Sequence, residues 1–473
     1  MSNELADLSA TELLELYRAK RASPVEATRA CLARIDAWNP TVNAFCVVDG
    51  DAALRAARES EARWTRGAPE GSLDGVPVSI KDLLLTSGWP TLRGSRTVDA
   101  KQSWDDDAPS VARLREHRAV LLGKTTTPEF GWKAVTDGPL TGITRNPWNV
   151  AKTPGGSSGG AAAAVAAGMG PLAIGTDGAG SIRIPAAFTG IFGLKPSFGR
   201  VPAWPLSLFG TVSHVGPMTR TVLDAALMLN VISEPDVRDW FALPYDVRDY
   251  RDGLADGIAG LRVAFAPTLA GAKVDPEVGD IVARAVSAFG ELGAEVVEAA
   301  PDLCDVASVE RVHWWTGAAR VLASIPPERR ALADPGLLRI AEKGCAFTLD
   351  DYLQAVEARA RLGAALKRFH ARYPILLTPT LPISAFDAGR LAPPQHGDVD
   401  GDWTVWAPFS YPFNLTQQPA ASVPCGFTRD GLPVGLQIVG PMHGDALVLR
   451  VARAFEEARP WHASYARLAV ADH

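Results

Sequence analysis

The stretch that decides the fold is Gly175-Thr-Asp-Gly-Ala-Gly-Ser181, which follows a short apolar run, Leu172-Ala-Ile174. A glycine-rich turn that directly follows a strand is typical of an α/β fold. Glycine lets the backbone approach a ligand closely and adopt dihedral angles that other residues avoid. Successive amides at Gly178, Ala179, Gly180 and Ser181 can therefore point at one oxygen atom, as an oxyanion hole requires.

Two upstream segments add chemistry to this turn. Val76, Val78 and Ile80 alternate with other residues and predict a short strand that ends at Lys81. The loop Gly155-Gly-Ser-Ser-Gly-Gly160 opens an apolar run, Ala161 to Ile174, which is shorter than the ~20 residues of a membrane span and predicts a buried helix. A serine can act as a nucleophile if a base takes its proton. A buried lysine can be that base, because burial disfavours the charged amine and lowers its pKa.

The N-terminal 66 residues predict helices. Ser9 and Ser23 each precede a glutamate by three positions, which is the capping-box pattern of a helix start. Asn39-Pro40 is expected to end the second helix. A strand is expected over Ala44–Val48 and a surface helix over Asp51–Arg66.

The second half of the chain changes character near Ile232. A strand–helix–strand pattern is expected over 261–298, and helical segments fill much of 306–373. Strand-like segments return at 375–380 and 434–439. The sequence therefore predicts a catalytic core made of 1–230 and 371–473, with an α/β and helical insertion at 231–370 that contributes to the substrate side.

Composition excludes several classes of function. The chain has 473 residues, of which 47% are hydrophobic and 21% charged, and 47 basic against 53 acidic side chains give a net charge of −6. No basic block marks a nucleic-acid site. The N-terminus lacks a signal pattern, so we expect a cytoplasmic protein without a membrane span. No Cys-x-x-Cys or His-Glu-x-x-His occurs, so we expect no metal, cofactor or disulfide framework. The five cysteines are Cys31, Cys46, Cys304, Cys345 and Cys425.

One alternative nucleophile is present in the serine loop. Residues 156–160 match Gly-x-Ser-x-Gly, the turn that carries the nucleophile of α/β-hydrolases. That turn must follow a strand, whereas residues 149–154 are a poor strand. Several histidines lie downstream, so the number of histidines alone does not exclude one of them as the base for this serine.

The combination of Lys81, the serine loop and the nucleophile turn resembles the amidase signature enzymes, which include aryl acylamidases and the glutaminase subunit of tRNA amidotransferase. The closest resemblance runs from Gly75 to about Asp224, and it is looser over Leu377–Ala454. This resemblance implies a large mixed central sheet flanked by helices. It also implies that Ser181 is the nucleophile, Ser157 a bridging serine after a cis peptide bond, and Lys81 the base.

The same resemblance suggests supporting roles and one departure. Asp177 and Arg183 match the motif and are expected to form a buried ion pair that braces the turn. Ala179 stands where the family commonly has glycine, and alanine disfavours positive φ, so we expect a small adjustment in the shape of the oxyanion hole.

The expected substrate is a small amide, ester or carbamate, and the sequence does not separate these three. Glutaminase subunits carry an acid ahead of a Pro-x-Asn-Leu segment, whereas residues 406–410 before Pro412-Phe-Asn-Leu415 contain none. Their paired arginines are also not evident around 334–344. A stand-alone amidase is therefore favoured, with a glutaminase subunit or a carbamate (urethane) hydrolase as alternatives, and a homodimer is compatible with the sequence. The expected apolar pocket residues are Phe130, Gly131, Trp132, Trp204, Phe209 and Trp406.

Overall fold

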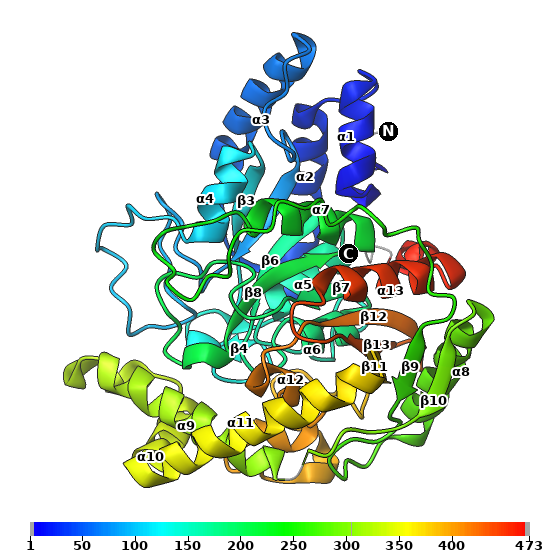
Figure 1. Ribbon diagram of the computed structural model, residues 1–473. Helices are drawn as coiled ribbons and strands as arrows, with labels where there is room; N and C mark the ends of the chain where they lie inside the picture. Colours follow the sequence, from blue (N-terminus) through cyan, green and yellow to red (C-terminus); the bar gives the residue numbers. More distant parts are fainter. Residues whose placement is uncertain (1–3, 304, 469–473) are drawn as a thin grey trace.

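An eleven-stranded sheet runs through the computed structural model, with helices on both of its faces (Figure 1). The structure describes residues 4–303 and 305–468, so Cys304 lies outside the described residues. The predicted α/β fold with a large mixed sheet is confirmed. In spatial order the strands are β1 (Phe45–Val48), β3 (Val120–Thr125), β2 (Pro77–Lys81), β6 (Leu172–Asp177), β8 (His214–Thr219), β7 (Phe192–Lys195), β12 (Ala420–Phe427), β13 (Pro433–Val439), β11 (Ile375–Pro379), β9 (Arg262–Phe265) and β10 (Glu295–Glu298).

Parallel pairing in one part of this sheet sets up the functional site. Strands β3, β2 and β6 run parallel, whereas β8, β7, β12 and β13 pair in antiparallel fashion. Ile80 of β2 lies opposite Ile174 of β6, so Lys81 and Thr176 come at neighbouring strand ends. The carboxyl ends of parallel strands meet at one edge of a sheet, which is where α/β proteins place their ligands.

Helices cover both faces of the sheet. On β11, Ile375 and Leu377 belong to one hydrophobic core and Leu376 to a second, as expected because alternate side chains of a strand point to opposite faces. The first core includes α4 (Pro109–Glu116), α7 (Val222–Ile232), α8 (Pro276–Glu291) and α13 (Asp445–Ala458). The second includes α6 (Arg183–Thr189), α9 (Val306–Ser324), α10 (Pro335–Cys345), α11 (Leu349–Arg372) and α12 (Pro412–Leu415).

The N-terminal helices are α1 (Ala10–Arg18), α2 (Pro24–Val42) and α3 (Gly50–Thr65), and both predicted capping boxes are present. The predicted end of the second helix at Asn39-Pro40 is wrong, because α2 continues to Val42 with Pro40 inside it. The last turn holds because the Asn43 N–H donates to the Asn39 carbonyl (2.8 Å). The Asn39 side chain also accepts from the amides of Ala44 and Phe45, each at 2.8 Å.

Two other expectations on elements change. The apolar run from Ala161 is not one helix: α5 covers Gly159–Ala166, and β6 begins at Leu172. Gly168 and Gly170 lie between them with positive φ, which allows the chain to turn. Strands β9 and β10, within the expected insertion, extend the central sheet beside β11, while the domain boundaries themselves stay a prediction. A separate small hairpin is formed by β4 (Asp137–Gly138) and β5 (Gly142–Ile143).

Within residues 4–303 and 305–468, no helix has both the length and the apolar character that a membrane span needs.

Candidate active site

Lys81 lies at the end of β2 and makes hydrogen bonds with three hydroxyl groups. Its Nζ is 2.7 Å from Ser157 Oγ, 2.8 Å from Ser158 Oγ and 2.9 Å from Thr176 Oγ1. The two serines come from the loop that leads into α5, and Thr176 comes from β6. Thr176 was not among the predicted site residues, and Ser158, the central serine of the Gly-x-Ser-x-Gly match, was considered only as an alternative nucleophile. Ser158 is adjacent to Ser157, and the β2–β6 pairing was the signal that could have indicated Thr176.

The Lys81 amine is fully buried and its hydrogen-bond partners are all neutral. Burial holds the pKa of Lys81 well below its ordinary value, and the more distant Asp177 carboxylate opposes this shift only in part. A lysine in such surroundings keeps an unprotonated amine far more readily than a solvated one. A neutral amine can accept a proton, which is what a general base must do.

Ser158 fixes the direction of one of these hydrogen bonds. Its hydroxyl donates to the Thr176 carbonyl at 3.1 Å, and its oxygen accepts from the Thr176 amide at 3.2 Å. A serine hydroxyl has one proton to give, so Ser158 must accept from Lys81. One N–H of Lys81 is therefore committed to Ser158, and its lone pair remains for another hydroxyl.

The serine loop and the nucleophile turn lie against each other. The Ser158 amide donates to the Ser181 carbonyl at 3.1 Å, and Ser181 is 3% exposed. The Gly156–Ser157 peptide bond is cis, as the family resemblance implied. Gly131 packs beside this loop with φ of +72°, and a Cβ placed on it would lie 3.1 Å from Ser157 Oγ. A larger residue at 131 would crowd the hydroxyl that contacts Lys81.

The predicted buried ion pair behind the turn is confirmed. Asp177 and Arg183 are both fully buried, with Oδ2 and Nε 3.0 Å apart. Burial disfavours the Asp177 carboxylate, but the guanidinium of Arg183 outweighs this and holds the pKa of Asp177 well below its usual range. Arg183 also donates to Asn414 Oδ1 (2.5 Å) and to Gln437 Oε1 (2.8 Å). The pair thus joins the turn to α12 and β13.

One of the four predicted oxyanion amides is already in use. The Gly180 amide donates to Asp177 Oδ1 at 2.7 Å. Within the described residues, the amides of Gly178, Ala179 and Ser181 make no hydrogen bond. The left-handed φ of the turn falls on Gly180 (+127°) and not on Ala179, so alanine fits this position without backbone strain.

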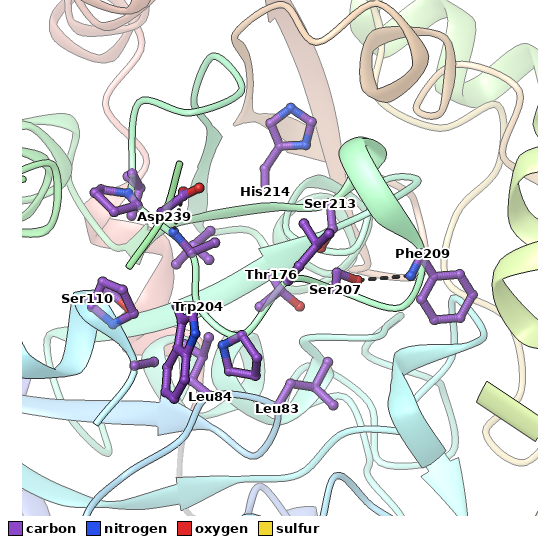
Figure 2. Close-up of a pocket in the computed structure, with 18 of the residues that line it drawn as sticks. Leu83, Leu84, Ser110, Thr176, Trp204, Ser207, Phe209, Ser213, His214 and Asp239 are labelled. Atoms are coloured by element: carbon purple, nitrogen blue, oxygen red, sulfur yellow. Dashed lines mark hydrogen bonds between the residues drawn. The ribbon is translucent and has the colours of Figure 1, made fainter. Parts of the chain in front are cut away.

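A mostly apolar pocket of about 360 Å³ reaches the Lys81 site through Thr176. Figure 2 shows Thr176 near its middle, with Trp204 and Phe209 on its wall. Of the six expected substrate-binding residues, Phe130, Trp204 and Phe209 line this pocket, and Gly131 lies beside Ser157. Trp132 and Trp406 do not line it.

Trp132 and Trp406 are part of the buried core. Trp132 is 1% exposed, and its carbonyl accepts from the indole N–H groups of Trp314 and Trp403. Trp406 is fully buried, and its own indole N–H donates to the Leu391 carbonyl at 3.0 Å. Their size and aromatic character suggested a pocket, but nothing local in the sequence indicates which face of the wall they occupy.

Trp314 of α9 is buried and also touches the site. It stacks on Phe209 with ring centroids 4.2 Å apart. A Cβ on Gly178 would lie 2.9 Å from its ring, so the tryptophan packs directly against the nucleophile turn. In the described part of the chain, no cluster of three His, Cys, Asp or Glu side chains could hold a metal ion.

Comparison with known proteins agrees with this geometry. The family model described as Amidase matches residues 26–449. An acylamidase of Rhodococcus erythropolis is 40% identical, with 96% of each chain covered. A glutamyl-tRNA(Gln) amidotransferase subunit from Chloroflexus aurantiacus is 36% identical over 99% of this chain and 100% of its own. The crystal structure of a bacterial aryl acylamidase superimposes with a TM-score of 0.89 at 32% identity, covering 98% of this chain and 99% of that one. The chain that carries this buried lysine and its serines therefore belongs to the amidase signature family of hydrolases.

Proposed function

We propose that this protein is a stand-alone amidase that cleaves C–N bonds through an acyl-enzyme on Ser181. The observation that carries the proposal is the contact of 2.7 Å between Lys81 Nζ and Ser157 Oγ. It joins a buried amine of depressed pKa to a hydroxyl, with neutral groups around it. The similarity to an acylamidase supports the same reaction.

Acylation begins with a proton relay through the two serines. Neutral Lys81 accepts the proton of Ser157, and Ser157 takes the proton of Ser181 as the Ser181 oxygen attacks the carbonyl carbon. The tetrahedral oxyanion is held by the amides of Gly178, Ala179 and Ser181, which are not used within the described part of the protein. Gly180 is left out of this set because its amide already donates to Asp177.

Collapse of the tetrahedral intermediate breaks the C–N bond. The proton held by Lys81 returns through Ser157 to the departing nitrogen, which leaves as a neutral amine. Water then attacks the acyl-enzyme with the same relay acting as base, and the acid product leaves Ser181 free. Esters and carbamates present the same carbonyl carbon and can follow the same path.

An active-site probe tests the nucleophile directly. A fluorophosphonate reacts with activated serines, and peptide mapping locates its label. We expect the label on Ser181 in the wild-type protein and no label in Ser181→Ala. A Ser197→Ala variant is the matched control, because Ser197 is buried but hydrogen-bonded to Asp445 at 2.7 Å. Absence of label from Ser181 in a folded sample would contradict the proposal.

A second candidate is the glutaminase subunit of a tRNA-dependent amidotransferase. It is favoured by 36% identity to such a subunit over nearly the whole chain. The missing acid in residues 406–410 argues against it, since nothing there would hold the amino group of glutamine. Ammonia release from glutamine, compared with acetanilide hydrolysis by the same sample, separates the two functions.

A further inference from the structure

Arg93 brings a guanidinium group to the pocket wall. It lines the pocket wall, and its guanidinium makes no hydrogen bond or ion pair with the described residues. The nearby carboxylate is Asp82, which already lies 3.3 Å from Lys124 Nζ and accepts from the Gly94 amide at 3.2 Å. Asp82 is thus already engaged by Lys124, and the Arg93 guanidinium has no carboxylate partner of its own among the described residues.

The first turn of α4 adds to this positive character. Ala108, Pro109 and Ser110 line the same pocket. The N-cap residue Ala108 has no side-chain oxygen, so no side chain at the cap position accepts from the first amides of the helix. Ser110 is 1% exposed, and its hydroxyl has no hydrogen-bond partner among the described residues. A buried hydroxyl normally has a partner.

Acidic side chains near this end are already engaged. Asp239, which lines the pocket, accepts from the amides of Ala203 (2.8 Å) and Phe241 (2.9 Å). Asp107, just before α4, pairs with Arg115 at 3.0 Å and accepts from the Ser87 amide at 2.7 Å. Neither of these carboxylates pairs with Arg93 within the described residues, so the guanidinium keeps N–H groups that can donate to a ligand.

The position of these groups relates them to the reacting carbonyl. Figure 2 shows Ser110 on one side of the pocket and Phe209 on the opposite side, with Thr176 between them. Thr176 contacts Lys81, so the middle of the pocket lies next to this lysine, although Lys81, Ser157 and Ser181 do not themselves line it. A bound amide can reach the charged end with one substituent and the aromatic end with the other.

We infer that Arg93, Ser110 and the first turn of α4 form a carboxylate-binding corner that selects amides carrying an acid group. This inference rests on the proposed function, because it concerns the substrate of the same site. A guanidinium and a hydroxyl can both donate to carboxylate oxygens, and such charge-assisted hydrogen bonds are stronger than neutral ones. The apolar remainder of the pocket accommodates the rest of the substrate.

Matched substrate pairs test this specificity. One pair is para-acetamidobenzoate and para-isopropylacetanilide, with the acid on the amine side. The other is succinanilate and the anilide with isopropyl in place of its carboxylate, with the acid on the acyl side. We expect the wild-type kcat/KM to favour the acid in at least one pair. Arg93→Met should reduce that preference roughly tenfold to a hundredfold, and Ser110→Ala by a smaller factor.

The control is Arg113→Met, which removes an arginine of α4 that pairs with Glu116 at 2.5 Å and does not line the pocket. It should leave the preference unchanged. Inhibition of neutral anilide turnover by benzoate, but not by toluene, gives a second measurement on the wild-type protein if Arg93→Met does not fold. No acid preference in either pair, or an equal loss for acid and neutral substrates in Arg93→Met, would overturn the inference. Failure of the proposed function looks different: the neutral anilides are not hydrolysed and Ser181 takes no label.

Discussion

Two lysines of the central sheet, Lys81 on β2 and Lys195 on β7, are both fully buried, yet their surroundings differ in kind. Burial holds the pKa of each well below its ordinary value. Lys81 contacts three hydroxyls and, at 3.5 Å, the Thr176 carbonyl, whereas the contacts of Lys195 are the carbonyl oxygens of Pro196 and Gln418. A hydroxyl both donates and accepts a proton, but a carbonyl only accepts a hydrogen bond. Burial alone therefore does not make a lysine a base, and its partners decide whether a proton can move on.

Replacing each lysine by methionine gives the largest expected contrast. Lys81→Met should lower kcat for acetanilide on the order of 10⁴-fold, because members of a catalytic set fail together when one is removed. Lys195→Met should keep kcat within a few fold when it is expressed per folded molecule, since Lys195 has no hydroxyl through which to pass a proton. Near-ultraviolet circular dichroism supplies the folded fraction of each variant, because this signal does not depend on the reactivity of Ser181. An equal loss of kcat in both variants would mean that the hydrogen-bond partners of a buried lysine do not decide whether it acts as the base.

Breaking the ion pair behind the nucleophile turn should have the next largest effect. Asp177→Asn leaves Arg183 buried without its carboxylate, which typically costs about 3–5 kcal/mol of unfolding free energy. Urea unfolding followed by fluorescence measures this loss. The matched control is Asp387→Asn, because Asp387 pairs with Lys152 at 2.8 Å on the surface. That pair is solvated, so its loss should leave the urea midpoint nearly unchanged. Similar shifts in both variants would contradict a bracing role for Asp177.

The two lysines should also separate in their pH dependence. If Lys81 is the base, kcat/KM falls about tenfold per pH unit below its depressed pKa and levels off above it. Unfolding returns both lysines to a pKa near 10.5, so between the depressed values and 10.5 the unfolded chain binds more protons than the native one. Stability should therefore rise with pH across that window. Lys195→Met should weaken this rise and leave the pH–rate profile in place. A rate profile that moves with Lys195 would reverse the assignment.

The surroundings of Lys81 could be predicted in part from the sequence, because several of their features depend on short segments of the chain. The strand ending at Lys81 and the glycine-rich turn were predicted because each depends on neighbours within a few positions, and the Asp177–Arg183 pair was implied by the family resemblance. Strands β7, β8 and β12 were missed. They interleave with distant strands, and their residues, such as Gly193 and Pro217, have low strand propensity that sheet packing overrides. The surroundings of Lys195 depend on β7 and on Gln418, so they could not be predicted without those strands.

The pocket shows the same limit. Phe130, Trp204 and Phe209 line it, whereas Trp132 and Trp406 are buried in the core. All five are aromatic, so residue type alone could not separate the two groups. Trp314 reaches the nucleophile turn from α9, which lies far away in sequence. No local motif marks Arg93 as a pocket residue. That Asp82 pairs with Lys124, and so is not the partner of Arg93, can be learned only from the three-dimensional structure.

The smallest change in kcat is expected for Ser158, one of the two serines beside Lys81. Ser158 accepts from Lys81 and donates to the Thr176 carbonyl, so it orients the amine without passing a proton to the substrate. Ser158→Ala should lower kcat roughly three- to tenfold, the value of one neutral hydrogen bond, whereas Ser157→Ala breaks the relay and should cost far more. Because a misoriented amine still holds the same charge, the pH–rate profile of Ser158→Ala should keep its shape, and Ser158→Thr should restore part of the rate. If Ser158→Ala were as inactive as Ser157→Ala, the proton would pass through Ser158, and the elbow-like Gly-x-Ser-x-Gly motif would regain its claim on the chemistry.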